Sequence, residues 1–235
     1  MIFSRPRHIL FAVLAAISLL AVPTVASTAS RIVVFGAASG SHLSLSTKGS
    51  TIVVDGVMAH TPPQGCHFIR GHNAASCPTA GAYAIEVDMG PNNDFVELGD
   101  SMPFPLTVHL GSGQDKFIGG GEKDVCYSEG TRRNRCVGGP GNDVCITGSR
   151  NSDCVGGAGD DYCKTSTGSD GCWGGPGNDV CYMGPGEDGC HGEEGDDRLY
   201  GEAGADQLYG GSGQDFCDGG SGVGQSHECE LGPGN

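Results

Sequence analysis

The chain has 235 residues, of which 43 are glycine and 12 are cysteine, and its 28 acidic residues outnumber its 13 basic ones to give a net charge of −15. This acid excess argues against nucleic acid or an anionic membrane as a partner, because both require a basic surface. The glycine lacks the strict period of three found in collagen, and the apolar residues after the N-terminus are too few for a large α/β enzyme core.

Residues 1–26 have the pattern of a secretory signal peptide. Arg5 and Arg7 precede an apolar run over residues 9–22, which is too short to span a bilayer comfortably. Small residues at 24–26 offer a cleavage site, and residues 27–29 offer a second one. An uncleaved membrane anchor is the alternative interpretation. We therefore expect a secreted, extracellular protein, in which an even number of cysteines favours disulfides over thiols.

Residues 27–109 predict an N-terminal β cap that continues into the next segment. Glycine, proline and asparagine turns separate short β-like runs at 31–35, 43–45, 51–55, 83–88 and 94–98. Residues 90–97 already look like a degenerate copy of the repeat that follows. A stack of repeats needs such a cap, because its end strands otherwise leave backbone groups unpaired.

No catalytic set is recognisable in this segment. The histidines lack the His-Glu-x-x-His spacing of a zinc hydrolase, and no Gly-x-Ser-x-Gly elbow occurs. The glycine-rich stretch at 36–40 lacks the Gly-Lys-Ser/Thr ending of a phosphate loop. We therefore expect a non-enzymatic protein, with a small hydrolase in residues 30–109 as the alternative.

A nine-residue repeat fills residues 110–218, and residues 219–235 follow it as a C-terminal tail. Its frame is clearest at 138–146, 156–164 and 174–182, where the sequence reads Gly-Gly-x-Gly-x-Asp-x-U-x, with U apolar or cysteine. Units begin at 110, 119, 129, 138, 147, 156, 165, 174, 183, 192, 201 and 210, with one residue inserted before the unit at 129. So many consecutive units in one frame indicate a repeat architecture.

Each unit combines a flexible turn with a short strand. The glycines permit positive φ in the turn, and the last three residues can form a strand whose side chains alternate between its two faces. The eighth position is therefore expected to point inward. These positions are Phe117, Cys126, Cys136, Cys145, Cys154, Cys163, Cys172, Cys181, Cys190, Leu199, Leu208 and Cys217. All are apolar or cysteine, which supports the frame independently of the glycines.

The units resemble the RTX, or hemolysin-type, calcium-binding repeat family. The segment with Cys66, Cys77 and residues 85–94 is similar to the N-terminal region of small secreted actinobacterial proteins of this type. The resemblance implies an all-β fold, a parallel β-roll (a β-solenoid) in which two units complete one coil. It also implies Ca²⁺ as the bound ion.

If two units make a coil, the sixth positions of alternate units form two columns. The first column contains Asp124, Asp143, Asp161, Asp179, Asp197 and Asp215. The second contains Asp115, Asn134, Ser152, Asp170, Asp188 and Asp206. Stacked strands lie about 4.8 Å apart, where two carboxylates repel by about 0.9 kcal/mol in water and about 3.5 kcal/mol at an effective dielectric of 20. A divalent cation between successive turns would reverse the sign of this interaction.

Calcium suits such a site because it takes six to eight oxygen ligands in flexible geometry. We expect about five sites along the first column and about two near Asp170, Asp188 and Asp206 in the second. The turn carbonyls expected to complete them belong to Gly139, Gly141, Gly157, Gly159, Gly175 and Gly177. Solvated surface carboxylates are the alternative, and it is strongest for Asp115 and Asp124, whose turns depart from the pattern.

Most of the cysteines occupy inward positions, where the RTX family normally carries leucine, isoleucine or valine. Disulfides are favoured in an exported chain, with buried thiols and a soft-metal site as alternatives. One scheme pairs neighbouring units across the roll as Cys126–Cys136, Cys145–Cys154, Cys163–Cys172 and Cys181–Cys190. The other pairs residues along one sheet, such as Cys145 with Cys163. Both schemes leave Cys217 to pair with Cys229, and Cys66 with Cys77.

The sequence therefore predicts a secreted, non-enzymatic calcium-binding protein whose folding is completed by extracellular calcium. A surface adhesion module, a soft-metal-binding protein and a small hydrolase are the alternatives. A protein or cell-surface partner could bind an outward stripe, for which ordinary strand composition is the competing explanation. The stripe consists of Val125, Tyr127, Val144, Ile146, Tyr162, Val180, Tyr182 and Tyr200.

Overall fold

The computed structural model describes residues 30–35, 42–48, 51–56, 67–68, 74–78, 82–99, 102–148 and 150–230. The predicted signal peptide, residues 1–26, lies outside this range. The described residues form strands and turns without a helix, which confirms the all-β prediction. Accordingly, no helix among them is long and apolar enough to cross a membrane.

The strands follow one another at short intervals along the chain. The N-terminal strands are β1 (Ser30–Phe35), β2 (His42–Lys48), β3 (Thr51–Gly56), β4 (His67–Phe68), β5 (Ala74–Pro78), β6 (Ala82–Asp88), β7 (Phe95–Leu98) and β8 (Leu106–His109). The next are β9 (Lys116–Ile118), β10 (Val125–Tyr127), β11 (Arg135–Pro140), β12 (Val144–Ile146), β13 (Asp153–Ala158), β14 (Tyr162–Lys164), β15 (Gly171–Pro176) and β16 (Val180–Tyr182). The last are β17 (Pro185–Gly186), β18 (Gly189–Glu194), β19 (Arg198–Tyr200), β20 (Ala203–Gly204), β21 (Gln207–Ser212), β22 (Phe216–Asp218) and β23 (Gln225–His227).

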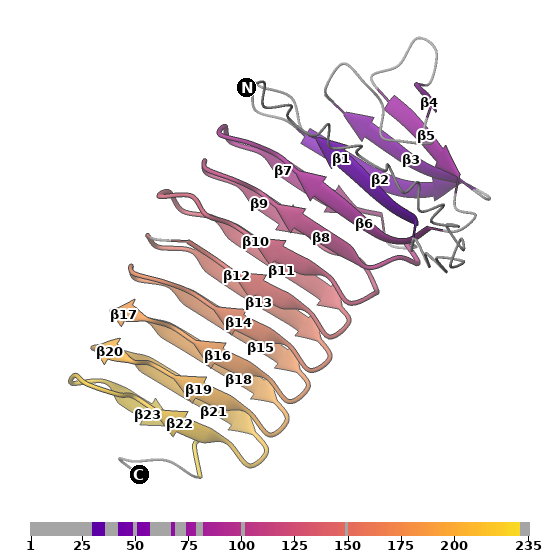
Figure 1. The fold of residues 1–235 in the computed structure, drawn as a ribbon. Coiled ribbons are helices and arrows are strands. Elements are labelled where there is room, and N and C mark those ends of the chain that lie inside the picture. The colour runs from indigo at the N-terminus through magenta and orange to yellow at the C-terminus, as the bar shows by residue number, and fades with distance from the viewer. Residues whose placement is uncertain are drawn as a thin grey trace, which may run out of the picture.

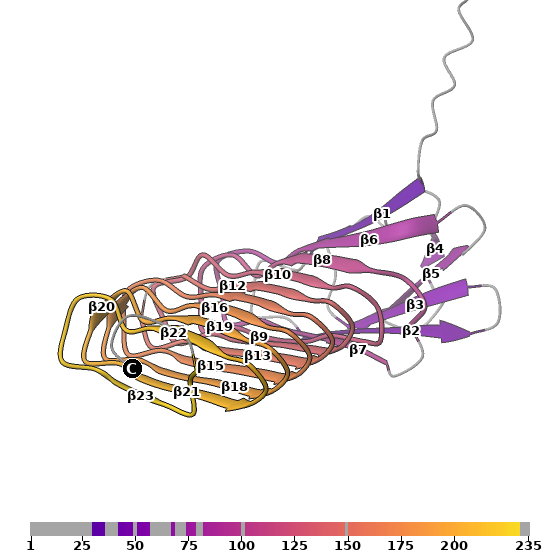
Figure 2. The ribbon, with the colours of Figure 1, turned by 90° about the horizontal axis from the view of Figure 1, so that it is seen from below.

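The chain winds into a flattened roll with one long sheet on each face (Figures 1 and 2). One sheet has nine strands in the order β1-β6-β8-β10-β12-β14-β16-β19-β22. The other has twelve, in the order β23-β21-β18-β15-β13-β11-β9-β7-β2-β3-β5-β4. Successive repeat units alternate between the two sheets, so strands that are neighbours in sequence face each other across a narrow core. This is the predicted parallel β-roll.

The strand register confirms that two units complete one coil. Cys126 pairs with Cys145 across a separation of 19 residues, which includes the one-residue insertion before the unit at 129. Beyond the insertion the separation is 18, as where Cys145 pairs with Cys163 and Cys154 with Cys172. Each inward position therefore stacks on the inward position of the next coil, and each turn stacks on the turn two units away.

The predicted inward residues form the core. Every eighth-position side chain from Phe117 to Cys217 is at most 2% exposed. The core continues without a break into the N-terminal coils through apolar residues on β2, β6, β7 and β8, among them Leu43, Val87 and Val96. Apolar side chains thus fill the N-terminal part of the roll, and sulfur fills most of the rest.

The N-terminal segment extends both sheets. Its strands β1, β2, β3, β6 and β7 lie at the five β-like runs expected from the sequence. β2 pairs in parallel with β7, and β3, β5 and β4 then continue the same sheet in antiparallel order. The sequence missed β4, β5 and β8, since the first two are short or rich in small residues and β8 directly follows Pro105.

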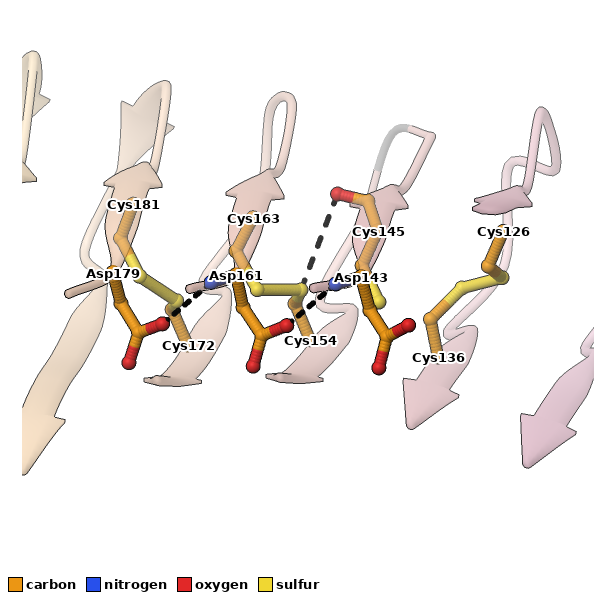
Figure 3. The surroundings of a disulfide bond; sticks show 10 residues. All are labelled: Cys126, Cys136, Asp143, Cys145, Cys154, Asp161, Cys163, Cys172, Asp179 and Cys181. Atoms are coloured by element: carbon orange, nitrogen blue, oxygen red, sulfur yellow. Dashed lines mark hydrogen bonds between the residues drawn. A yellow bond between two sulfur atoms is a disulfide. The ribbon is translucent and has the colours of Figure 1, made fainter. Parts of the chain in front are cut away.

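The disulfides correct the expected pairing. Cys126–Cys136 and Cys217–Cys229 are present as expected, whereas the remaining core bonds are Cys154–Cys163 and Cys172–Cys181 (Figure 3). The predicted bonds Cys145–Cys154, Cys163–Cys172 and Cys181–Cys190 are therefore wrong, as is same-sheet pairing of Cys145 with Cys163. Cys145 and Cys190 are buried thiols instead.

The physical reason is that each core cysteine faces two equivalent neighbours across the roll. Sγ of Cys145, Cys154 and Cys163 all lie within 4.8 Å of one another. The unit before and the unit after are each nine residues away, so sequence spacing cannot distinguish the two pairings. The expected Cys66–Cys77 bond involves side chains outside the described part of the structure.

Candidate metal centre

The first column is a ladder of aspartates at one edge of the roll. Oδ1 of each aspartate after Asp124 accepts a hydrogen bond from the backbone N–H of the aspartate one coil earlier in the chain (Figure 3). The N···O distance is 2.7 Å from Asp143 to Asp161 and from Asp161 to Asp179. The same contact joins Asp124 to Asp143, Asp179 to Asp197, and Asp197 to Asp215, at 2.7–2.9 Å.

The second oxygen of these carboxylates is buried without a hydrogen-bond partner. This holds for Oδ2 of Asp143, Asp161, Asp179, Asp197 and Asp215 in the first column, and of Asp115, Asp170, Asp188 and Asp206 in the second. Unpartnered buried carboxylate oxygens are costly, and buried charges in proteins are normally paired or bound to a metal. The ladder therefore lacks the positive charge that would compensate its buried carboxylates.

The pKa values of the ladder carboxyls also indicate uncompensated negative charge. Burial raises the pKa of the Asp143 and Asp179 carboxyls to about 7, with repulsion from adjacent rungs adding to the rise and the backbone hydrogen bond opposing it. Burial likewise raises the pKa of Asp161 and Asp197 to about 6, and that of Asp188 in the second column to about 7. Protein groups alone therefore do not stabilise the charged form of these carboxylates.

The turns beside the carboxylates pack so tightly that only glycine fits. A Cβ on Gly174 would lie 2.2 Å from Oδ2 of Asp179. A Cβ on Gly157 or Gly159 would lie 2.0 or 1.8 Å from the carbonyl oxygen of Gly139 or Gly141, one coil earlier. The six glycines named from the sequence all have φ between 105° and 150°. Glycine here brings carbonyl oxygens and unpartnered carboxylate oxygens to the same edge of the roll.

These atoms form a donor set that suits a hard divalent cation. The set contains only carboxylate and carbonyl oxygens, which calcium prefers, and repeats once per coil. Asp124 differs from the other rungs, because its Oδ1 accepts from the N–H of Leu106 at 2.8 Å and its Oδ2 from the N–H of Gly120 at 2.7 Å. Its two oxygens are thus already used by the protein.

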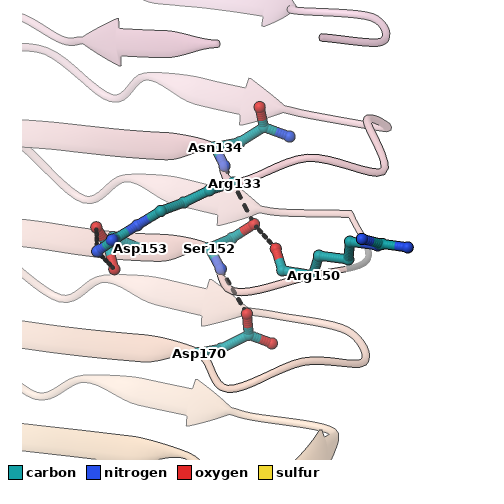
Figure 4. A network of polar contacts seen from close by, with 6 residues as sticks. All are labelled: Arg133, Asn134, Arg150, Ser152, Asp153 and Asp170. Atoms are coloured by element: carbon teal, nitrogen blue, oxygen red, sulfur yellow. Dashed lines mark hydrogen bonds and ion pairs between the residues drawn. The ribbon is translucent and has the colours of Figure 1, made fainter. Parts of the chain in front are cut away.

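The second column continues through neutral rungs (Figure 4). The Asp115 N–H donates to Oδ1 of Asn134 at 2.7 Å, and the Asn134 N–H to Oγ of Ser152 at 3.4 Å. The Ser152 N–H in turn donates to Oδ1 of Asp170 at 2.6 Å, from where the carboxylate ladder proceeds through Asp188 to Asp206. The backbone ladder is therefore unbroken, while its charge is interrupted at two rungs.

The sequence missed one rung, Asp94. It is buried, and its N–H donates to Oδ1 of Asp115 at 2.8 Å. The signal was present in residues 90–94, Gly-Pro-Asn-Asn-Asp, which end in the same Asn-Asp pair as the turns at Asp143 and Asp179. The second column thus begins one coil earlier than the unit at 110.

The soft-metal alternative has few thiols available. Two groups of three core cysteines have Sγ atoms within 4.8 Å of one another, Cys145-Cys154-Cys163 and Cys163-Cys172-Cys181. Every member except Cys145 is in a disulfide. Burial, followed by repulsion from the aspartate rungs, also raises the pKa of the Cys145 thiol, which disfavours the thiolate that metal binding needs.

Comparison with known families agrees with the donor set. The model of the RTX calcium-binding nonapeptide repeat matches residues 147–181, 155–189 and 191–225. The chain therefore contains stretches that match RTX calcium-binding nonapeptide repeats. RTX nonapeptide repeats bind Ca²⁺. A comparison with curated proteins found no match. The matched stretches of RTX repeats contain the complete rungs from Asp161 onward, and the neutral rung Asn134 lies before them.

Proposed function

We propose that this chain is a secreted, non-enzymatic protein whose RTX roll takes up calcium outside the cell. The observation that carries the proposal is the repeated, buried and unpartnered Oδ2 atom beside a stacked glycine turn. One cation per pair of stacked turns would meet carboxylate oxygens and turn carbonyls together. Export is supported by the sequence of residues 1–26 and by the core disulfides, which persist in oxidising compartments.

The proposed ligands follow from the geometry. In the first column they are the carboxylates of Asp143, Asp161, Asp179, Asp197 and Asp215, with Asp124 closing the N-terminal end through its backbone contacts. In the second column they are Asp170, Asp188 and Asp206. The carbonyl groups of Gly139, Gly141, Gly157, Gly159, Gly175 and Gly177 line the gaps between the stacked turns of the first column.

Calcium would then complete folding rather than start it. A disulfide typically contributes about 2–4 kcal/mol, so Cys126–Cys136, Cys154–Cys163 and Cys172–Cys181 hold neighbouring units together before any ion binds. Empty carboxylate columns repel, and this repulsion would keep the chain open where calcium is scarce. Binding in the extracellular medium would remove it.

Native mass spectrometry of the exported protein, with calcium and with chelator, tests this proposal. We expect about five or more bound ions in calcium and none in chelator, from the count of complete rungs and the oxygen-only donor set. Calorimetric titration measures the same stoichiometry in solution. Fewer than three bound ions would contradict a calcium ladder, and an N-terminus at Met1 on the exported chain would contradict signal cleavage.

The predicted Val/Tyr stripe lies on the outer face of the nine-stranded sheet, but its side chains are only half-exposed. Tyr182 and Tyr200 stack on each other with centroids 4.5 Å apart, which shields both rings. Among the described residues, the exposed large hydrophobic side chains are Trp173 and Val223, neither of which belongs to the stripe. We therefore assign it no partner.

A further inference from the structure

The edge of the roll that carries the second column is divided by charge. Its N-terminal turns, at 111–118, 129–137 and 147–155, carry five basic residues and three acidic ones. The basic residues are Lys116, Arg132, Arg133, Arg135 and Arg150. The corresponding C-terminal turns, at 165–172, 183–190 and 201–208, carry five acidic residues and no basic one. A chain with a net charge of −15 thus gathers much of its positive charge in one short stretch.

The basic stretch coincides with the interruption of the calcium pattern. Asn134 and Ser152 replace carboxylates there, and the fourth position of the same two turns is Arg132 and Arg150. Arg150 has φ of 81°, a left-handed conformation that glycine adopts freely and arginine does not. Strained residues of this kind concentrate at functional sites. The turn has therefore kept a backbone shape suited to glycine while presenting a guanidinium group.

Most of this positive charge is uncompensated. Arg133 forms a two-point contact with Asp153, with Nη2 2.9 Å from Oδ2 and 3.2 Å from Oδ1 (Figure 4). Arg132, Arg135 and Arg150 are exposed and have no carboxylate within ion-pair distance among the described residues. In Figure 4 the Arg150 side chain extends away from the column while its carbonyl accepts the Ser152 hydroxyl at 2.8 Å. The guanidinium groups are thus accessible to a ligand.

Two polar hollows lie against these side chains. The larger, of about 530 Å³, is lined by Asn93, Ser112, Thr131 and Arg132 together with the turn backbone. The other, of about 410 Å³, is lined by Lys116, Arg133, Arg135 and Asp153 among others. Arg135 and Lys116 are paired in register on β11 and β9, so their cationic groups sit on neighbouring coils. Hydroxyl, amide and guanidinium donors around a concave surface suit an oxyanion.

We propose that this cationic edge binds a ligand that carries several sulfate or phosphate groups. The planar guanidinium group binds such tetrahedral oxyanions through two parallel hydrogen bonds. Cations on successive coils, whose strands lie about 4.8 Å apart, favour a ligand with several anionic groups over a single ion. The inference goes beyond calcium binding and does not require an ion in the second column. Calcium neutralises the acidic turns nearby and so reduces their repulsion of the ligand.

Binding is tested on the exported protein in saturating calcium at low ionic strength. The probes are a sulfated hexasaccharide, sodium polyphosphate and inorganic sulfate, measured by calorimetry. The variant R132S/R150S removes two uncompensated charges. R198S is the control for loss of positive charge elsewhere on the roll, because Arg198 is exposed on β19 of the opposite sheet. We expect affinity for the multivalent probes to fall as salt rises and to drop about tenfold or more in R132S/R150S, with R198S within about twofold of the parent.

The two multivalent probes distinguish the source of the oxyanion, since tighter binding of one identifies sulfate or phosphate as the natural group. Binding of inorganic sulfate alone, or equal affinity of R132S/R150S and R198S, would overturn the proposal. The bound-calcium count of each variant is measured in parallel. An unchanged count shows that the roll and its calcium sites are intact, so this failure is separable from failure of the calcium proposal.

A reciprocal variant restores the repeat pattern at the interruption. R132G/N134D/R150G/S152D places glycine and aspartate where the other turns have them. We expect it to lose binding of the multivalent probes and to bind more calcium ions than the parent chain. Retention of the parent's affinity for the sulfated hexasaccharide in this variant would show that the basic turns do not hold the ligand. If the variant does not fold, the comparison of R132S/R150S with R198S decides the question.

Discussion

Replacing Asp179 by asparagine is expected to stabilise the calcium-free roll and to weaken the loaded one. Asparagine retains an Oδ1 that can accept the Asp161 N–H, now 2.7 Å from the carboxylate. The protein already uses this solution at Asn134, whose Oδ1 accepts the Asp115 N–H at the same distance. The substitution therefore removes charge without removing the backbone contact.

The size of the effect follows from the neighbours of the rung. Asp161 and Asp197 lie one coil away on either side, at the strand spacing of about 4.8 Å. Each repels an ionised Asp179 by about 0.9 kcal/mol at the dielectric of water and about 3.5 kcal/mol at a dielectric of 20. We expect the calcium-free variant to gain about 2 kcal/mol or more at pH 8, where the rung is largely ionised. In calcium it loses a ligand from two adjacent gaps and becomes less stable than the parent.

Denaturant unfolding in chelator and in calcium, at pH 8, measures both effects. Asp218→Asn serves as the control for charge, because Asp218 lies on the outer face of β22 and asparagine can still accept the Gly220 N–H, now 2.9 Å from its Oδ1. We expect D179N to change the free energy of unfolding with opposite sign in chelator and in calcium, and the control to change it with the same sign in both. A D179N protein that is less stable than the parent in chelator would show that repulsion along the ladder does not govern the stability of the calcium-free roll.

Three further outcomes are expected from the same geometry. In chelator, the unfolding temperature should fall between pH 5 and pH 8, because the folded pKa of Asp143 is raised from 3.8 to about 7 and the folded state therefore holds protons that the unfolded chain has released. In saturating calcium this fall should largely disappear, because the bound ion keeps the carboxylates ionised in the folded state as they are in the unfolded chain. A flat profile in chelator would contradict the assignment. Cys145 and Cys190 should resist alkylation in the native protein, and both should react once the protein is denatured without reductant. Peptide mass mapping identifies the labelled residues. Rapid labelling of the native protein would mean that the two thiols are not buried. Gly159→Ala should lower the free energy of unfolding by at least about 2 kcal/mol, because φ is 130° and the new Cβ meets a carbonyl oxygen. Gly189→Ala, where a Cβ would lie in open space, should lower it by less than about 1 kcal/mol. Equal losses in denaturant unfolding would contradict the tight stacking of the turns.

The nine-residue period made the centre of the molecule predictable. Once two units form a coil, strand alternation places Phe117 and Cys163 inside, and the coil period places Asp143 beneath Asp161. These are consequences of geometry that hold for any side chain at the same position. The frame alone therefore identified both the core and the columns.

The disulfide pairing, the rung at Asp94 and the N-terminal antiparallel strands depended on contacts that the period does not specify. Cys154 faces Cys145 and Cys163 at equal sequence distance, so the choice between them lies in small differences of side-chain position. Asp94 lies in a turn too degenerate to be counted as a unit, although its backbone contact is the same as those of later rungs. The antiparallel strands β3, β4 and β5 follow no repeat, and only local patterning was available for them.

The alternation of units between the two faces has a consequence for how such a chain can change length. Loss of eighteen residues removes one coil and leaves every later side chain on its original face. Loss of nine residues removes a single unit. The core stays apolar, but every later side chain moves to the opposite face of the roll. Without residues 156–164, Asp143 would be followed by Asp170 and Ser152 by Asp179, and the tyrosines of one sheet would exchange places with the Trp173 side chain of the other. Surfaces on this roll can therefore be inherited intact only in steps of a whole coil.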